Sequence, residues 1–139
     1  MMRPIVINGD VWRVVRVDSG NPHLVDRTGH ERLATTDSES MTIYVLSTVK
    51  PPLLDKVMVH EVSHAVTVSY GLLDSLRSMI PPSLWVRVEE WAAQLVENHG
   101  LEAYDKASDA LGRPVCVEGA CFDRPRQDRP RDTRLGGQR

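Results

Sequence analysis

Two histidines and a glutamate lie within five residues of one another, in the segment His60-Glu61-Val62-Ser63-His64. If this segment is helical, His60 and His64 lie one turn apart on one face, so both imidazoles can reach a single metal ion. Glu61 directly follows the first histidine and can reach a water molecule on that ion. In this pattern, H-E-x-x-H, the histidines bind zinc and the glutamate is a general base. The segment therefore predicts a zinc site with His60 and His64 as ligands and Glu61 as the catalytic base.

The residues around the motif favour a buried helix. The segment Val57–Gly71 is apolar on nearly all sides, which is typical of a helix at the centre of a small domain. Burying two histidines and a glutamate there costs free energy unless these groups bind something. Zn²⁺ suits two imidazoles and a carboxylate well, although Mn²⁺, Co²⁺ and Fe²⁺ also accept such ligands.

A catalytic zinc site needs a third protein ligand and one open position for water. Two adjacent glutamates, Glu89 and Glu90, lie 25 and 26 residues after His64, which is enough chain for a second helix to turn back onto the first. Helical periodicity favours Glu89, because it lies closer to the apolar stripe of that helix. The members of this stripe are Trp85, Val88, Ala92 and Val96. From the residues alone, the third ligand stays open between the two glutamates.

The elements that position these residues form two groups along the chain. Residues 4–48 predict strands, among them Val11–Val17, which follows the turn Asn8-Gly9, and Met41–Ser47. Helices are predicted at 53–70, 84–99 and 101–111, each with a glycine just after its end. We therefore expect an α+β fold, in which a small antiparallel sheet of three to four strands packs on two or three helices.

Length and charge limit the remaining possibilities. The 139 residues predict one domain over residues 1–112 and a disordered tail over 113–139, which is rich in Arg, Pro and Asp. The net charge of −2 and the lack of a helix-turn-helix argue against direct nucleic-acid binding, and no apolar run is long enough for a membrane span. The apolar run at the N-terminus is too short for a signal peptide, so we expect a cytoplasmic protein. In that compartment Cys116 and Cys121 are expected to be free thiols.

Over residues 4–105 the chain resembles compact, gluzincin-like H-E-x-x-H zinc metallopeptidases. The thermolysin-like group and the ImmA/IrrE-type peptidases of phages and prophages are examples. In these families a small residue stands three positions after the liganding glutamate and Asp or Asn stands four positions after it. Here Ala93 and Gln94 follow Glu90 at those positions, so the resemblance implies Glu90 as the third ligand, with Gln94 in a supporting role. It also implies a minimal zincin-like fold in which an edge strand, expected at Met41–Ser47, pairs with an extended peptide substrate.

The function that this resemblance implies is a zinc-dependent endopeptidase. Zinc would be held by His60, His64 and Glu90, with Glu61 as general base toward a water molecule. The substrate would be a protein or peptide, and relatives of the ImmA type suggest a regulatory protein in a phage or mobile element. The donor to the oxyanion stays open among four residues. These are Tyr44, Tyr70, His99 and Tyr104.

Two other readings remain open from the sequence. The stretch Glu118-Gly119-Ala120-Cys121 faintly resembles the E-G-C stretch of peptide deformylase, in which a cysteine is the third zinc ligand. In that family, however, the cysteine precedes the H-E-x-x-H motif. A zincin fold can also persist as a catalytically silent binding or regulatory module.

Overall fold

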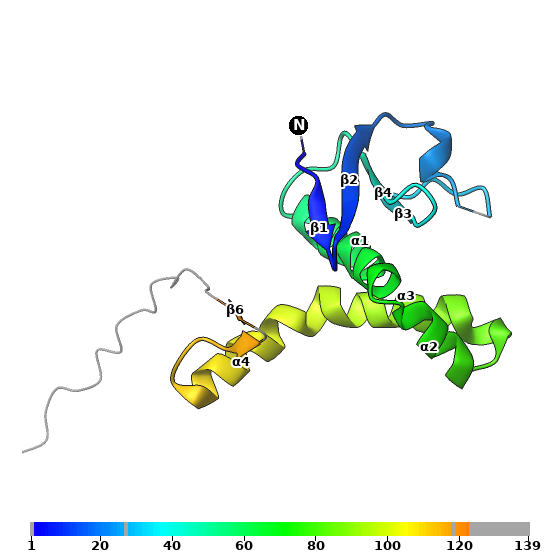
Figure 1. Ribbon diagram of the computed structural model, residues 1–139. Coiled ribbons are helices and arrows are strands. Elements are labelled where there is room, and N and C mark those ends of the chain that lie inside the picture. Colours follow the sequence, from blue (N-terminus) through cyan, green and yellow to red (C-terminus); the bar gives the residue numbers. More distant parts are fainter. Residues whose placement is uncertain (1, 27, 118, 123–139) are drawn as a thin grey trace, which may run out of the picture. The chain divides into compact units, whose positions relative to one another are not determined.

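The computed structural model describes residues 2–26, 28–117 and 119–122, and the chain divides into two compact units after Gly100 (Figure 1). The first unit combines a four-stranded sheet with helices, and the second combines a helix with a two-stranded sheet. The expected α+β class is therefore confirmed. The predicted boundary at residue 112 differs from this division, because the helix that precedes it belongs to the second unit.

The sheet of the first unit has the strand order β1-β2-β4-β3. Its strands are β1 (Ile5–Ile7), β2 (Asp10–Val17), β3 (Ala34–Asp37) and β4 (Thr42–Leu46). The turn predicted at Asn8-Gly9 joins β1 to β2, and both residues have positive φ, 49° and 83°. Two successive positive φ values fit the tight turn whose twist matches that of a hairpin.

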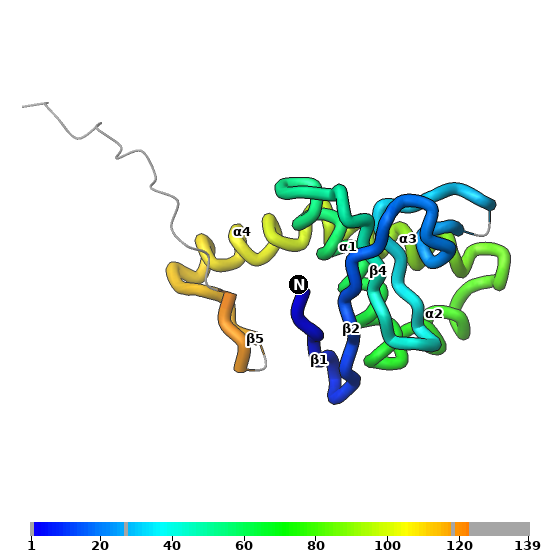
Figure 2. The backbone as a smooth tube through the Cα atoms, turned by 90° about the horizontal axis from the view of Figure 1, so that it is seen from above, coloured from blue at the N-terminus to red at the C-terminus, as the bar shows by residue number. Residues whose placement is uncertain are grey.

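The expectation of an antiparallel sheet is wrong at one position, because β2 and β4 run parallel, with Val15 opposite Tyr44. The chain leaves β2 through the short helix η1 (Pro22–Leu24), forms β3 at the far edge, and returns as β4 between β2 and β3 (Figure 2). The strand expected to be an edge strand is thus internal. The free edge nearest the motif helix is β3, which contacts that helix directly.

Helix α1 (Leu53–Ser69) carries the H-E-x-x-H motif and packs on one face of the sheet (Figure 1). The alternation of β2 turns Trp12 inward, where it is fully buried, while its neighbour Val11 is exposed. Ile43, Val45 and Ala65 complete most of this core. The indole N–H of Trp12 donates to the Ser69 hydroxyl at 2.7 Å, which fixes the end of α1 against the sheet.

The other helices of the first unit follow α1 closely. They are α2 (Leu72–Met79), the 3₁₀ turn η2 (Pro82–Leu84), α3 (Trp85–Leu95) and the π-helical turn η3 (Val96–Gly100). Gly71 ends α1 as predicted, with a left-handed φ of 67°. Between α1, α2 and α3 lies an apolar cleft of about 520 Å³, so the motif helix is less fully buried than expected. No helix in the described ranges is both long and apolar enough to cross a membrane.

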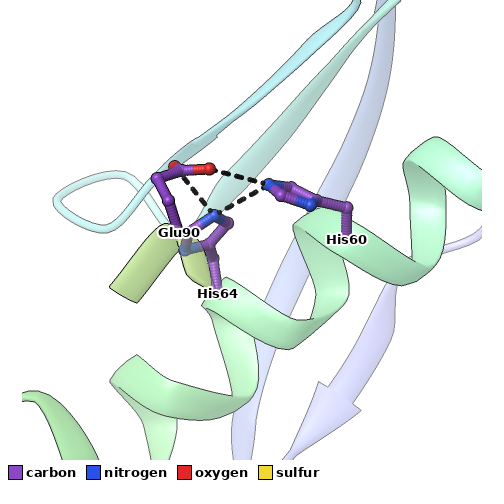
Figure 3. A group of neighbouring side chains, drawn as sticks. All are labelled: His60, His64 and Glu90. Atoms are coloured by element: carbon purple, nitrogen blue, oxygen red, sulfur yellow. Dashed lines mark hydrogen bonds and ion pairs between the residues drawn. The ribbon is translucent and has the colours of Figure 1, made fainter. Parts of the chain in front are cut away.

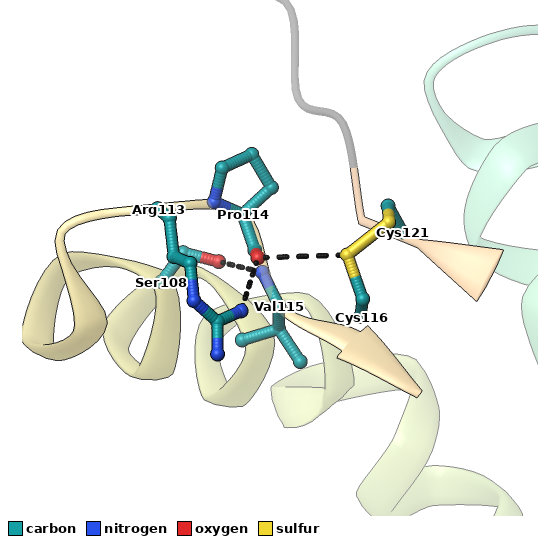
Figure 4. The surroundings of a disulfide bond; sticks show 6 residues. All are labelled: Ser108, Arg113, Pro114, Val115, Cys116 and Cys121. Carbon is teal, nitrogen blue, oxygen red and sulfur yellow. Dashed lines mark hydrogen bonds between the residues drawn. A yellow bond between two sulfur atoms is a disulfide. The ribbon is translucent and has the colours of Figure 1, made fainter. Parts of the chain in front are cut away.

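The second unit contains helix α4 (Leu101–Leu111) and a hairpin of β5 (Cys116–Val117) and β6 (Ala120–Cys121). The hairpin register places Cys116 opposite Cys121, and the two form a disulfide (Figure 4). The prediction of free thiols is therefore wrong, because hairpin pairing brings both sulfur atoms to the same side. Part of the predicted tail is thus structured, and residues 123–139 lie outside the described residues.

Candidate metal centre

The motif residues project from one side of α1 toward α3, as the helical spacing predicts. His64 and Glu61 are buried, and His60 is half-buried. From α3, the Glu90 side chain reaches over both imidazoles, and the three side chains point toward one another (Figure 3). The structure therefore brings together His60, His64 and Glu90, a group that can hold a metal ion.

The spacing of the three groups fits a small tetrahedral cation. The two Nε2 atoms of His60 and His64 lie 3.2 Å apart. Glu90 Oε2 is 3.2 Å from His60 Nε2, and Glu90 Oε1 is 3.3 Å from His64 Nε2. Ligands at about 2.0–2.1 Å from a tetrahedral zinc ion lie about 3.3–3.4 Å from one another. The observed separations are thus similar to the ligand–ligand distances of such a tetrahedron. The two Glu90 contacts are made by different oxygens of one carboxylate, so the three side chains converge on one place, where a single Glu90 oxygen can complete the ligand set.

Both glutamates of the Glu89-Glu90 pair contact the site, which explains why periodicity and family resemblance disagreed. Glu90 faces the two Nε2 atoms, whereas Glu89 Oε1 lies 3.0 Å from His64 Nδ1, on the far side of that ring. Their positions 100° apart on α3 straddle the line of contact with α1. Ala93, 3% exposed, lies between the two helices, as expected of a small residue there.

A third carboxylate, Glu97, supports the site and was missed by sequence reasoning. It belongs to the π-helical turn η3, and its Oε2 lies 3.0 Å from His60 Nδ1. Glu97 follows Glu90 by seven residues, two helical turns along the same face, and this spacing is the signal that marks it. Gln94, expected in this supporting role, is instead exposed. Each histidine of the motif thus has its own carboxylate behind the ring.

This arrangement fixes the tautomer of both histidines and concentrates acceptor atoms at the centre. A neutral imidazole that donates Nδ1–H to a carboxylate presents Nε2 as an acceptor. In that form, two Nε2 atoms and the Glu90 carboxylate all direct lone pairs at one point, and this is favourable only if a cation or a proton lies there. Carboxylates behind metal-binding histidines orient the rings and increase their basicity.

The pKa shifts of the metal-free centre agree with three groups that direct lone pairs at one point. Burial lowers the pKa of His64, but hydrogen bonds to Glu89 and Glu90 outweigh it and raise this pKa to about 10. The hydrogen bond to Glu90 also raises the pKa of His60, against the lowering effect of burial. Hydrogen bonds from both histidines hold the pKa of Glu90 well below its ordinary value. Protons therefore occupy the centre strongly, and a metal ion must displace them.

Glu61, the predicted base, lies beside the cluster without being part of it. Glu61 is 7% exposed as a residue, and its charge raises the pKa of both His60 and His64. Glu61 Oε2 accepts a hydrogen bond of 2.6 Å from the Thr36 hydroxyl on β3. Nothing in the local sequence marks Thr36, because it precedes Glu61 by 25 residues.

The structure does not bring the other candidate residues into the cluster. Tyr44 stacks on His23, with ring centroids 4.1 Å apart, on the sheet face away from α1. Tyr70 is exposed at the end of α1. Tyr104 belongs to the second unit, where its ring stacks on Phe122. His99 lies in η3 outside the metal-binding group. None of the four is therefore identified as the oxyanion donor.

Comparisons with protein-family models, with curated proteins and with solved structures give no match to this chain. The similarity to compact zinc peptidases accordingly rests on the motif and on the geometry of the cluster. The cysteine of the deformylase-like alternative is not available as a ligand in this structure, because Cys121 is bonded to Cys116.

Proposed function

We propose that this protein is a zinc-dependent endopeptidase that uses His60, His64 and Glu90 as metal ligands and Glu61 as general base. The observation that carries the proposal is the convergence of three groups beside the buried Glu61: the two Nε2 atoms lie 3.2 Å apart, and the two Glu90 oxygens lie 3.2 Å and 3.3 Å from them. Each ring also has a carboxylate partner at Nδ1, which is the support that metal-binding histidines usually have. A helix that carries two histidines by chance would not need these partners.

When bound, zinc polarises a carbonyl oxygen and lowers the pKa of a water molecule at the open position. Glu61 accepts a proton from that water as its oxygen bonds to the carbonyl carbon of the peptide. The C–N bond then breaks, and Glu61 passes the same proton to the leaving amine. This proton balance needs a carboxylate that is shielded from bulk water, and Glu61 is a buried carboxylate that accepts a hydrogen bond.

The edge of β3 is the place where an extended substrate can add to the sheet. The Leu33 carbonyl accepts from Leu46 N–H, so alternation directs the backbone groups of Thr35 toward β4. The backbone groups of Ala34 and Thr36 then face outward from the sheet. A peptide paired there would run beside α1, close to Glu61. The substrate was expected to pair with the strand at Met41–Ser47, but that strand, β4, is internal. The proposed docking strand is therefore β3.

Cleavage of a peptide library tests the proposal without knowledge of the natural substrate. We expect the zinc-loaded protein to cleave library peptides, with products identified by mass spectrometry, and the chelated protein to leave them intact. Glu61→Gln should keep its zinc and lose about 10²–10⁴-fold in rate, the usual contribution of a general base. Glu39→Gln, a change at an exposed turn, is the matched control and should cleave normally.

Two results would count against the proposal in different ways. Undiminished cleavage by Glu61→Gln would remove Glu61 from the role of base. Full zinc occupancy without cleavage of any library peptide would favour the catalytically silent binding module. The resemblance to ImmA/IrrE-type peptidases extends the proposal to a regulatory protein as the substrate, in a cytoplasmic setting.

A further inference from the structure

Thr36 connects the free edge of the sheet to the proposed base. Its hydroxyl donates to Glu61 Oε2 at 2.6 Å and lies 3.1 Å from the main-chain oxygen of Glu61. Ile43, its partner on β4, is fully buried in the core beneath α1, so Thr36 also faces the helix. Within the described residues, this hydroxyl is the hydrogen-bond partner of the Glu61 carboxylate.

This bond decides how the carboxylate is oriented. A glutamate side chain has three rotatable bonds, and an unrestrained carboxylate samples several rotamers. With Oε2 held by Thr36, the second oxygen, Oε1, is left to accept a proton from a group at the metal. A general base acts efficiently only when it lies within hydrogen-bond distance of the proton that it removes.

We infer that Thr36 is a positioning residue, whose hydroxyl holds the Glu61 carboxylate so that Oε1 faces the reacting group at the metal. This inference rests on the proposed function for its catalytic meaning. The same residue presents its backbone groups at the edge of β3, so a peptide bound there contacts the residue that holds the base. Thr36 thereby links the place of substrate docking to the place of proton transfer.

The neighbouring residue provides a matched control. Thr35 lies on the same strand, and its hydroxyl donates to the His23 carbonyl at 2.7 Å, on the opposite face of the sheet. Thr36→Val removes the hydroxyl and keeps the side-chain shape, and Thr35→Val does the same on the other face. Thr36→Ser keeps the hydroxyl and serves as the rescue variant.

Two readouts separate positioning from stability. The first is the affinity of acetohydroxamic acid for the Co²⁺-loaded protein, followed by the visible absorption of cobalt. This small chelator binds the metal and carries a hydroxyl that hydrogen-bonds a carboxylate beside it. We expect Thr36→Val to bind the probe about tenfold more weakly and to bind Co²⁺ as well as the wild type does. Tenfold is the lower end of the loss that follows when a residue supporting a metal site is removed. Thr36→Ser and Thr35→Val should behave as wild type.

The second readout is peptide cleavage. We expect Thr36→Val to lower kcat by about 10–100-fold with KM unchanged, and Thr36→Ser to restore it. Unchanged probe affinity in Thr36→Val would overturn the inference. Loss of folding in both Thr36→Val and Thr36→Ala would assign the bond to stability and overturn it as well. If no variant cleaves any peptide but Thr36→Val still weakens probe binding, the positioning role stands and the peptidase proposal fails.

Discussion

Zinc binding to this protein should release protons, and the structure gives the size of the effect. The pKa of His64 is raised to about 10, so at pH 7 its ring is protonated in nearly all metal-free molecules. Removing that proton at pH 7 costs about 4 kcal/mol, three pH units at about 1.4 kcal/mol each. The side chain is only 11% exposed, so solvent does little to weaken this coupling. Apparent zinc affinity should therefore rise about tenfold per pH unit from His64 alone.

The pKa of His60 is also raised, so zinc must displace a second proton in part of the molecules near neutral pH. This adds to the pH dependence of the zinc affinity. We expect a slope between about 1 and about 2 for the logarithm of the affinity against pH, from about pH 6 to about pH 8.5. Competition with a chromogenic chelator of known protonation measures this slope. Glu89→Gln is the comparison variant, because it removes a carboxylate that raises the pKa of His64 without removing a proposed ligand, and it should make the slope smaller. A flat profile in the wild-type protein would refute the reasoning.

Three further predictions concern the surroundings of the centre. Glu89→Gln and Glu97→Gln should each weaken zinc binding by about 10–100-fold in the chelator assay, whereas Glu39→Gln should not. In the metal-free protein, the pKa of His64 is higher in the folded state than its ordinary 6.5, so its stabilising contribution is complete below about pH 6.5. This contribution is lost as the pH rises through about 10, which urea unfolding at several pH values measures. Cys121→Ser should keep one zinc per chain by metal analysis, and loss of zinc would revive cysteine as a ligand.

The part of the centre that lies on one helix could be predicted from the sequence. His60, Glu61 and His64 owe their relative positions to the helical repeat, which depends only on the residues between them. The start of α1 at Leu53 and the glycine after its end were also predicted, because proline and glycine act locally. Such features need no knowledge of what packs against the helix.

The choice between Glu89 and Glu90 needed the rotation of α3 against α1, which local periodicity does not fix. The apolar stripe predicted that Glu89 faces α1, and this side chain does so. Its carboxylate, however, contacts Nδ1 of His64, the ring nitrogen that points away from the other two ligands. The seven-residue spacing from Glu90 points to Glu97, but that spacing does not predict the π-helical turn in which Glu97 lies. Its contact with His60 spans 37 residues and depends on the packing of both helices.

The pairing of the strands was the other feature that the sequence did not predict. β2 and β4 could be recognised from their β-branched residues and the turn signals near them, but the insertion of β4 between β2 and β3 is a property of the whole chain path. The same holds for the disulfide, where the hairpin register places Cys116 opposite Cys121. Disulfides persist mainly in oxidising compartments, so the cytoplasmic location stays a prediction.

X-ray absorption at the zinc edge, on protein that carries one zinc per chain, is the most direct test of the metal centre. His60, His64 and Glu90 predict nitrogen and oxygen neighbours at about 2.0–2.1 Å, with the outer-shell pattern of two imidazoles and no sulfur. A sulfur neighbour at about 2.3 Å, or a shell of oxygen atoms without imidazole, would contradict the centre described above.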